Sequence, residues 1–264
     1  MTRRYLAFAC EGDALVAGLD EGPGSSGLLL VSGGNEVRAG AWAGQAQLAA
    51  RIAAAGHPVL RFDRRGVGDS EGVNRGFRES VPDIAAALAA FRAAAPQLRR
   101  VIGFGNCDAA SALMLGAAEL GLDGLVLANP WTIEAQPGDP EVGDTPTMPA
   151  AAIRARYLRK LADPREVWRL LRGGVDLGKL GRGLKAAAKP APRSSLAADM
   201  AAGLGRFGGP VTIALAEFDR TALAFLAAWD KRDPRLQRFA SASHSFADDA
   251  AQAFLANLLL AALA

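Results

Sequence analysis

The sequence predicts an α/β protein: a mostly parallel, twisted sheet of eight strands with helices on both faces and an inserted helical cap. Short β-like apolar runs alternate with longer helical runs, which is typical of βαβ units. The 264 residues are 50% hydrophobic, enough for one core. The alternation breaks once, between Pro130 and Gly209. We therefore predict one core domain from residues 1–129 and 210–264, interrupted by a cap at 130–209.

The opening segment predicts a β-hairpin. Two apolar runs, Tyr5–Ala9 and Ala14–Leu19, flank the turn-forming residues Glu11-Gly12-Asp13. Six further strands are predicted at Gly27–Val31, Pro58–Phe62, Arg100–Phe104, Gly124–Ala128, Val211–Ala216 and Leu236–Phe239. Between them lie runs rich in Ala and Leu, which favour helix. These helices are predicted at Trp42–Ala55, Val81–Ala95, Ala109–Leu120, Thr221–Lys231 and Phe246–Ala262.

The interruption predicts a functional insertion. Residues 130–209 contain no convincing buried strand and are rich in Pro, Gly and charge. Loops of such length are uncommon in compact domains unless they form a lid or another functional element. Three stretches have helical character: Ala150–Leu161, Arg165–Leu171 and Ser195–Ala202. We interpret the segment as a helical cap.

The composition favours a cytoplasmic protein without an integral membrane segment. The longest apolar stretches, Ile84–Ala95 and Ala250–Ala264, are broken by polar residues and fall short of the roughly 20 residues of a membrane span. The first residues have no apolar core of signal-peptide length. Cys10 and Cys107 lie far apart, which favours reduced thiols. Two cysteines and two histidines scattered in this way predict neither a metal site nor a cofactor.

The charge is unevenly distributed. The net charge is only +3, but residues 151–193 hold twelve Lys or Arg against three acidic residues. Such a segment could attract an anionic acyl carrier, a nucleotide-linked thioester, an acidic polysaccharide or an anionic membrane surface. The alternative is that these are solvated faces of cap helices. Nucleic acid is not predicted, because no binding motif accompanies the charge. The sequence sets no oligomeric state.

The strongest local signal is the run Val101–Ala110, an apolar strand that passes through a small-residue turn into an Ala-rich helix. It matches the G-x-S-x-G nucleophile elbow, with Cys107 in place of Ser and Ala109 in place of the second Gly. The N-terminus of the following helix should stabilise a thiolate at Cys107, although Asp108 opposes this if its carboxylate points at the sulfur. The alternative is an inert buried cysteine.

Two further residues complete a candidate catalytic triad. His244 follows the last predicted strand, and Asp219 follows the strand Val211–Ala216. The order nucleophile, acid, base is the order of an elbow-type triad. Glu217 is a rival for the acid, because either carboxylate could reach the same loop. His57 begins a strand and should therefore lie at the opposite end of the sheet.

An acyl-transfer site also needs donors for the oxyanion. The backbone N–H of Asp108 would supply one. The loop Ser32-Gly33-Gly34-Asn35 would supply another, from Gly34 or Asn35, because its glycines let the backbone approach a substrate. Trp131 could line the acyl pocket or pack against the cap. We interpret Ser111 as a packing residue and Cys10 as relevant only to oxidation.

A family resemblance rests on four motifs. The string Val59–Gly72, with Asp63-Arg64-Arg65-Gly66 and Gly68-Asp69-Ser70, looks like the strand-loop signature of α/β-hydrolases. Together with Gly33-Gly34, Gly105–Ala110 and Ser243–Phe246, it is similar to the exosortase A system-associated hydrolases of type 1. The resemblance implies the α/β-hydrolase fold and a setting beside exosortase protein sorting and exopolysaccharide production. Asn35-Glu36-Val37 departs from the Pro-Gln-Tyr type of sequence expected in that loop, so substrate contacts there do not carry over.

These observations lead to one function hypothesis and two alternatives. In the leading hypothesis Cys107, His244 and Asp219 cleave an ester or thioester of a small-molecule or carrier-linked acyl substrate through an acyl-enzyme. The first alternative is an acyltransferase that uses the same triad with an acceptor other than water. The second is a catalytically silent binding or scaffold protein of the same pathway.

Overall fold

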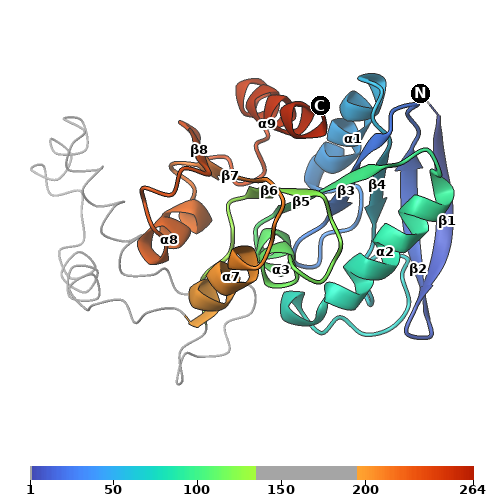
Figure 1. Cartoon of the computed structure of the whole chain (residues 1–264), viewed down its shortest axis with the longest axis horizontal. Coiled ribbons are helices and arrows are strands. Elements are labelled where there is room, and N and C mark those ends of the chain that lie inside the picture. The colour runs from blue at the N-terminus through green and yellow to red at the C-terminus, as the bar shows by residue number, and fades with distance from the viewer. Residues whose placement is uncertain (1, 135–194) are drawn as a thin grey trace, which may run out of the picture.

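A computed structural model describes residues 2–134 and 195–264. Its centre is an eight-stranded sheet in the order β1-β2-β4-β3-β5-β6-β7-β8 (Figure 1). The pairs β1·β2 and β2·β4 are antiparallel and all other neighbours are parallel, which confirms the predicted sheet. The strands are β1 Arg3–Cys10, β2 Asp13–Asp20, β3 Ser26–Val31, β4 Val59–Phe62, β5 Arg100–Asn106, β6 Gly124–Ala128, β7 Val211–Ala216 and β8 Leu236–Phe239.

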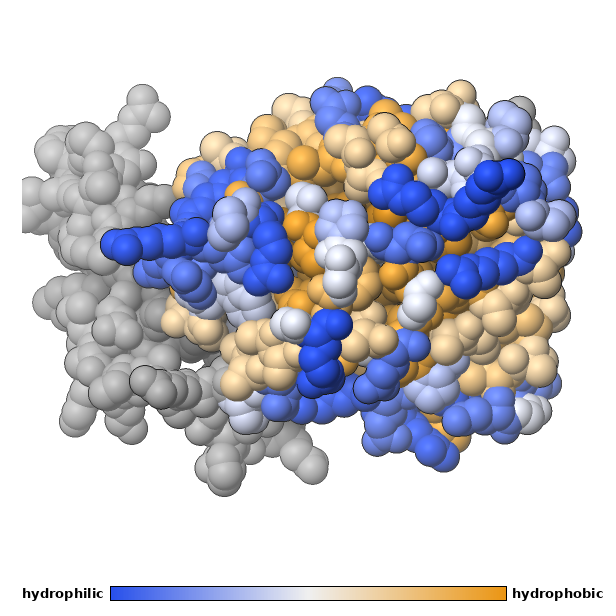
Figure 2. Space-filling model, viewed as in Figure 1, coloured by the Kyte–Doolittle hydropathy of each residue, from blue (hydrophilic) through white to orange (hydrophobic). Residues whose placement is uncertain are grey.

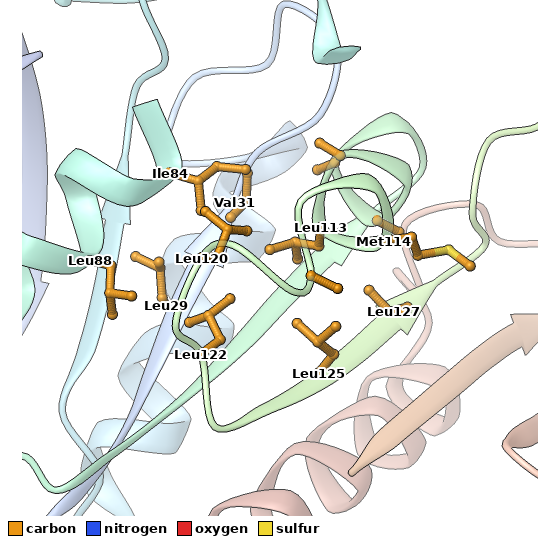
Figure 3. Close-up of a cluster of buried hydrophobic side chains, with 14 of the residues drawn as sticks. Leu29, Val31, Ile84, Leu88, Leu113, Met114, Leu120, Leu122, Leu125 and Leu127 are labelled. Carbon is orange, nitrogen blue, oxygen red and sulfur yellow. The ribbon is translucent and has the colours of Figure 1, made fainter. Parts of the chain in front are cut away.

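Helices cover both faces of the sheet (Figure 1). The α-helices are α1 Gly44–Ala54, α2 Val81–Ala94, α3 Asp108–Leu115, α7 Ser195–Gly205, α8 Arg220–Ala228 and α9 Asp249–Leu263, with 3₁₀ turns η1 Ala41–Ala43 and η2 Phe77–Glu79. Buried side chains of α2, α3, α7 and α8 form one cluster with the sheet, and those of α1 and α9 form a second. Figure 3 shows leucines from strands and helices meeting in the first cluster. The layers bury enough apolar surface to dominate stability.

The predicted hairpin is confirmed. Cys10 pairs with Asp13, so β1 and β2 are joined by the two residues Glu11 and Gly12. Both turn residues have positive φ angles, 50° and 99°, as in the tight turns whose twist matches that of antiparallel strands.

All five predicted core helices differ from the structure in at least one bound. Val81–Ala95 ends at Ala94, and Thr221–Lys231 spans Arg220–Ala228. The helix expected to begin at Trp42 begins at Gly44, because Trp42 and Ala43 have left-handed φ angles of 56° and 57°. The helix expected to reach Leu120 ends at Leu115, where Gly116 follows. The helix expected from Phe246 begins at Asp249, because Phe246 has φ 53° and Asp248 accepts a bond from the N–H of Ala251 as N-cap.

The predicted cap lies mostly outside the described residues, including Ala150–Leu161 and Arg165–Leu171. The third predicted cap helix is α7. It packs closely on α3, because a Cβ at Gly203 would collide with the carbonyl oxygen of Met114. Leu196 and Met200 join the same buried cluster as α3. This part of the insertion is therefore packed against the core.

The surface of the described part is mixed in character. On the face in Figure 2, hydrophobic and hydrophilic residues are interspersed. Within residues 2–134 and 195–264, no helix combines the length and the apolar character needed to cross a membrane.

Candidate active site

Cys107 lies at a sharp turn between β5 and α3. It is the N-cap of α3 and has φ 62° and ψ −126°, a conformation that costs a non-glycine residue about 1–3 kcal/mol. Hydrogen bonds hold it there: its N–H donates to the carbonyl of Ala128 at 2.9 Å, and its carbonyl accepts from the N–H of Trp131 at 3.2 Å. This strained turn from strand to helix is the geometry predicted for a nucleophile elbow.

Small residues make this turn sterically feasible. A Cβ at Gly105 would lie 2.7 Å from the carbonyl carbon of Ala109 and 2.8 Å from the N of Ala110. Gly33, on the neighbouring loop, is equally crowded, because a Cβ there would collide with Oδ1 of Asp108. The predicted small-residue turn thus has a steric reason at Gly105.

His244 and Asp219 lie together. Nδ1 of the imidazole is 3.0 Å from Oδ2 of the carboxylate. The same Oδ2 accepts bonds from the N–H groups of Thr221 and Ala222 at 2.9 and 3.1 Å, so Asp219 is also the N-cap of α8. Asp219 is buried, with 7% of its surface exposed. A carboxylate held by three donors is well suited to orient an imidazole.

The pKa of His244 is far from its ordinary value. Burial alone would lower it, but the hydrogen bond to Asp219, the hydrogen bond to the Cys107 thiol and the negative charges of both partners outweigh burial and raise the pKa to about 10. For Asp219, burial acts to raise the pKa, but the bonds and charge of His244 and the amides of Ala222 and Thr221 hold it below the usual range. The imidazole is therefore bonded to the Asp219 carboxylate, and the Cys107 thiol adds to the rise of its pKa.

Two asparagines hold the loop that carries His244. The Nδ2 groups of Asn106 and Asn129 donate to the main-chain carbonyl of His244 at 3.2 and 3.0 Å. Neither residue was singled out from the sequence. An asparagine at the end of a strand matches no sequence motif, so Asn129 could not be predicted. Asn106 could have been considered, because it precedes the elbow cysteine.

Glu217, the rival for the acid, and His57 take no part in this bond. Asp219, not Glu217, is the carboxylate bonded to the imidazole. His57 bonds through Nδ1 to the carbonyl of Ser26, at the start of β3, which is the opposite end of the sheet from Cys107.

The loop after β3 has an unexpected contact. The N–H of Gly34, predicted as an oxyanion donor, donates to Oδ1 of Asp108 at 2.7 Å. Asp108 itself is the first residue of α3, so its own N–H has no acceptor within the helix. Asn35 is exposed, and its Oδ1 accepts from the side chain of Asn74 at 2.7 Å. The loop and the elbow therefore meet, but through the Asp108 side chain.

Three polar residues support this loop through side-chain bonds, and one of them, Gln45, was not named from the sequence. Ser32 Oγ is 2.8 Å from Oε1 of Gln45, and the Gln45 amide donates to Glu36 at 2.5 Å. Glu36 also accepts from the N–H of Ala41 at 2.6 Å. Through Gln45, these bonds connect Ser32 at the start of the loop with Glu36 further along it.

Trp131 and Ser111 lie against the elbow. Trp131 is partly buried and packs against the first core cluster. Ser111 is fully buried, and its hydroxyl donates to the carbonyl of Trp131 at 2.7 Å. Ser111 is thus a packing and bonding residue, as expected. Nothing in the contacts of Trp131 tests its predicted role in an acyl pocket.

Cys10 is a different kind of thiol. It is buried, with its sulfur 3.5 Å from Oδ1 of Asp83. Burial, together with the Asp83 carboxylate, raises its pKa to about 11. Among the described residues, no cluster of three or more His, Cys, Asp or Glu could hold a metal ion.

Comparisons with known proteins agree with this fold. Residues 28–257 match the model of the Alpha/beta hydrolase family. No curated protein sequence matches the chain.

Solved structures resemble it over nearly the full length. The esterase Pf2001 of Pyrococcus furiosus is 13% identical with a TM-score of 0.62, covering 100% of this chain and 92% of that one. The alpha/beta hydrolase GrgF from Penicillium sp. sh18 is 17% identical with a TM-score of 0.61, covering 100% and 98%. The thioesterase domain of the curacin biosynthetic pathway is 17% identical with a TM-score of 0.55, covering 98% and 100%. At these identities the likeness concerns the fold.

Proposed function

Because the chain belongs to the alpha/beta hydrolase family, we propose that it hydrolyses an ester or thioester, with Cys107 as nucleophile, His244 as base and Asp219 as the acid that orients the imidazole. The observation that carries the proposal is the imidazole of His244, which bonds to the Asp219 carboxylate at 3.0 Å; the Cys107 thiol also contributes to raising the pKa of this imidazole. A thiol nucleophile is activated by a base beside it, and that base is oriented by an acid, which is the role we assign to Asp219.

The reaction proceeds in two balanced steps. The Cys107 thiolate attacks the carbonyl carbon, the sulfur–carbon bond forms, and the bond to the leaving oxygen or sulfur breaks as the His244 imidazolium donates a proton to it. Water then gives a proton to His244 and attacks the acyl-enzyme, which releases the acid and returns the thiolate. Cys107 lies at the N-terminus of α3, where the helix dipole favours negative charge.

The family and the fold support a hydrolase, and the names of two similar structures are consistent with ester or thioester cleavage. The alternative acceptor, another thiol or alcohol in place of water, would make the protein a transferase. The two reactions separate in one assay, because a transferase consumes the acceptor and produces little free acid. We propose hydrolysis, since the family is one of hydrolases.

We also propose a substrate class and a setting. The twelve basic residues in 151–193, outside the described residues, support an acyl group on an anionic carrier. Turnover of an anionic thioester should then fall as salt rises, while turnover of a neutral ester is unaffected.

The resemblance to exosortase-associated hydrolases supports a role beside exopolysaccharide production. A bacterium that lacks the protein should have altered exopolysaccharide, and an unaltered product would contradict this role. A thiol nucleophile suits the reducing cytoplasm.

The first experiment is alkylation by iodoacetamide across pH, with peptide mapping, on wild type and His244→Ala. Cys107 should be alkylated faster than Cys10 at each pH, and it should be alkylated more slowly in the variant than in wild type. Cys10 serves as an internal control, because its pKa of about 11 and its burial predict slow reaction. If Cys107 reacts no faster than Cys10, or ignores the loss of His244, the proposed function is wrong and a binding role leads. A positive result justifies a screen of esters and thioesters.

A further inference from the structure

Asp108 follows the proposed nucleophile, and its side chain is bonded to the Gly34 N–H, one of the amides predicted to bind the oxyanion. Its Oδ1 accepts from the N–H of Gly34 at 2.7 Å. A charged hydrogen bond of this length is among the stronger ones in proteins. As long as it persists, the Gly34 N–H cannot stabilise a substrate oxyanion, because an amide has a single proton to donate.

The loop is shaped to accept this carboxylate. Gly33 has no Cβ, and a Cβ at that position would collide with Asp108 Oδ1. Gly34 has φ 55°, a left-handed angle, and a Cβ there would meet nothing within 4 Å. The missing Cβ of Gly33 therefore lets a negatively charged oxygen approach the backbone, and the left-handed angle of Gly34 is one that glycine adopts readily. An approach open to a carboxylate oxygen is open to an oxyanion as well.

Arg64 lies beside the contact with unused hydrogen-bonding capacity. Its side chain is 3% exposed, and its Nη2 donates to the carbonyl of Gly34. Within the part of the chain that the structure describes, its Nη1 is buried without a hydrogen-bond partner. An unsatisfied buried donor costs about 1–3 kcal/mol, so an acceptor that reached it would be bound favourably.

The distance between the two charged groups is 3.8 Å, from Arg64 Nη2 to Asp108 Oδ2. This is an ion pair without a close hydrogen bond. The carboxylate is thus held by the Gly34 amide on one side and faces the guanidinium on the other.

We propose that Asp108 gates the oxyanion amide: it holds the N–H of Gly34 in the free protein and turns to the guanidinium of Arg64 when an acyl substrate binds. Asp108 and Arg64 are then positioning residues, because they act on the substrate through Gly34. The inference rests on the proposed function, since it needs Cys107 to attack a carbonyl.

The test compares two reactions of the same sulfur. Acylation by p-nitrophenyl acetate forms the sulfur–carbon bond and expels nitrophenolate through a tetrahedral oxyanion. Alkylation by iodoacetamide displaces iodide at a saturated carbon and develops no oxyanion. The ratio of the two rate constants, measured by mass spectrometry on Cys107, therefore isolates the use of the oxyanion amide from the reactivity of the thiolate.

Asp108→Ala should raise this ratio about tenfold, because a competitor for the Gly34 N–H has been removed. Asp108→Asn, which keeps the shape but removes the charge, should raise it less. In the wild-type background Arg64→Met should lower the ratio, because the Asp108 carboxylate loses the partner to which it would turn. In the Asp108→Ala background the same change should leave the ratio unaltered, because no carboxylate is present to bind the guanidinium.

Two results would overturn the proposal. An unchanged or lower ratio in Asp108→Ala would mean that the carboxylate supports the site instead of gating it. An equal effect of Arg64→Met in both backgrounds would mean that Arg64 only supports the loop through the Gly34 carbonyl. The alkylation rate separates these results from failure of the proposed function, because it depends on His244 and Cys107 whether or not the gate exists.

Discussion

Asn129 donates its side-chain N–H to the main-chain carbonyl of His244, with Nδ2 and the carbonyl oxygen 3.0 Å apart. Its Oδ1 accepts from the N–H of Ala216 at 2.9 Å. The side chain is fully buried, and its backbone has φ 40°, a left-handed angle that asparagine tolerates better than most residues. One amide therefore joins the end of β6 to the end of β7 and to the loop that carries the proposed base.

Asn129→Ala should weaken both the fold and the site. The change leaves the N–H of Ala216 without its acceptor, which should lower the free energy of unfolding by about 1–3 kcal/mol in urea denaturation. It also loosens the His244 loop, so alkylation of Cys107 should slow. Asn74→Ala, which removes two exposed bonds, to Asn35 and from the N–H of Gly76, is the matched control and should have neither effect. Equal behaviour of the two variants would contradict this role of Asn129.

The imidazole of His244 should stay protonated through neutral pH. Its pKa of about 10 results from the Asp219 and Cys107 interactions that outweigh burial. In an NMR titration the His244 ring signal should therefore have its midpoint near pH 10, and His57→Gln identifies that signal by removing the other histidine. Asp219→Asn should move the midpoint down, because burial then meets less opposition. A wild-type midpoint near the ordinary value of about 6.5 would count against the interaction.

The same shift predicts how stability depends on pH. The folded pKa lies above the unfolded value of 6.5, so protonation of His244 stabilises the folded state. This contribution is fully present below about pH 6.5 and is lost as pH rises through about 10. The difference in unfolding free energy between wild type and His244→Gln should shrink over that window. Urea denaturation at pH 6, 8 and 10 measures it, and a difference that grows with pH would have the wrong sign.

The sheet could be predicted because its signals are local. Most of the parallel strands are short apolar runs, and all six strands predicted after the hairpin are strands in the structure, including the half-polar β8 (Leu-Gln-Arg-Phe). Helix ends were predicted less well, because they depend on single backbone angles. The apolar pattern predicts that the last helix begins at Phe246. Phe246 has a left-handed φ of 53°, however, and the helix begins only after its N-cap, Asp248.

The candidate site divides in the same way. Cys107, His244 and Asp219 could be proposed because each follows a strand and their order is that of a known triad. The bond between Asp108 and Gly34 could not, because it joins residues 74 positions apart through a side-chain rotamer. The roles of Asn129 and Arg64 were missed for a similar reason: each depends on which buried groups otherwise lack partners, and that follows only from packing.

The choice of acid can be tested by a matched pair. Asp219→Asn keeps an acceptor for the N-cap of α8 but removes the charge beside His244, so alkylation of Cys107 should slow strongly. In Glu217→Gln, Cys107 should be alkylated at close to the wild-type rate, because the carboxylate bonded to His244 is that of Asp219. Circular dichroism checks that both variants fold. The opposite ranking would assign the acid to Glu217.

Gly105→Ala tests whether the elbow depends on close packing. The added Cβ would lie 2.7 Å from the carbonyl carbon of Ala109, an approach that real Cβ atoms essentially never show, and the contact is with the backbone of α3. The strand and helix must therefore separate, which should lower the free energy of unfolding by about 1–3 kcal/mol and displace Cys107 from His244. Gly208→Ala is the control, because a Cβ there meets nothing within 4 Å. The Gly105 variant could instead match the control in stability and in alkylation rate. In that case α3 tolerates a shift at its first turn, and the strained geometry of Cys107 does not depend on a glycine two residues before it.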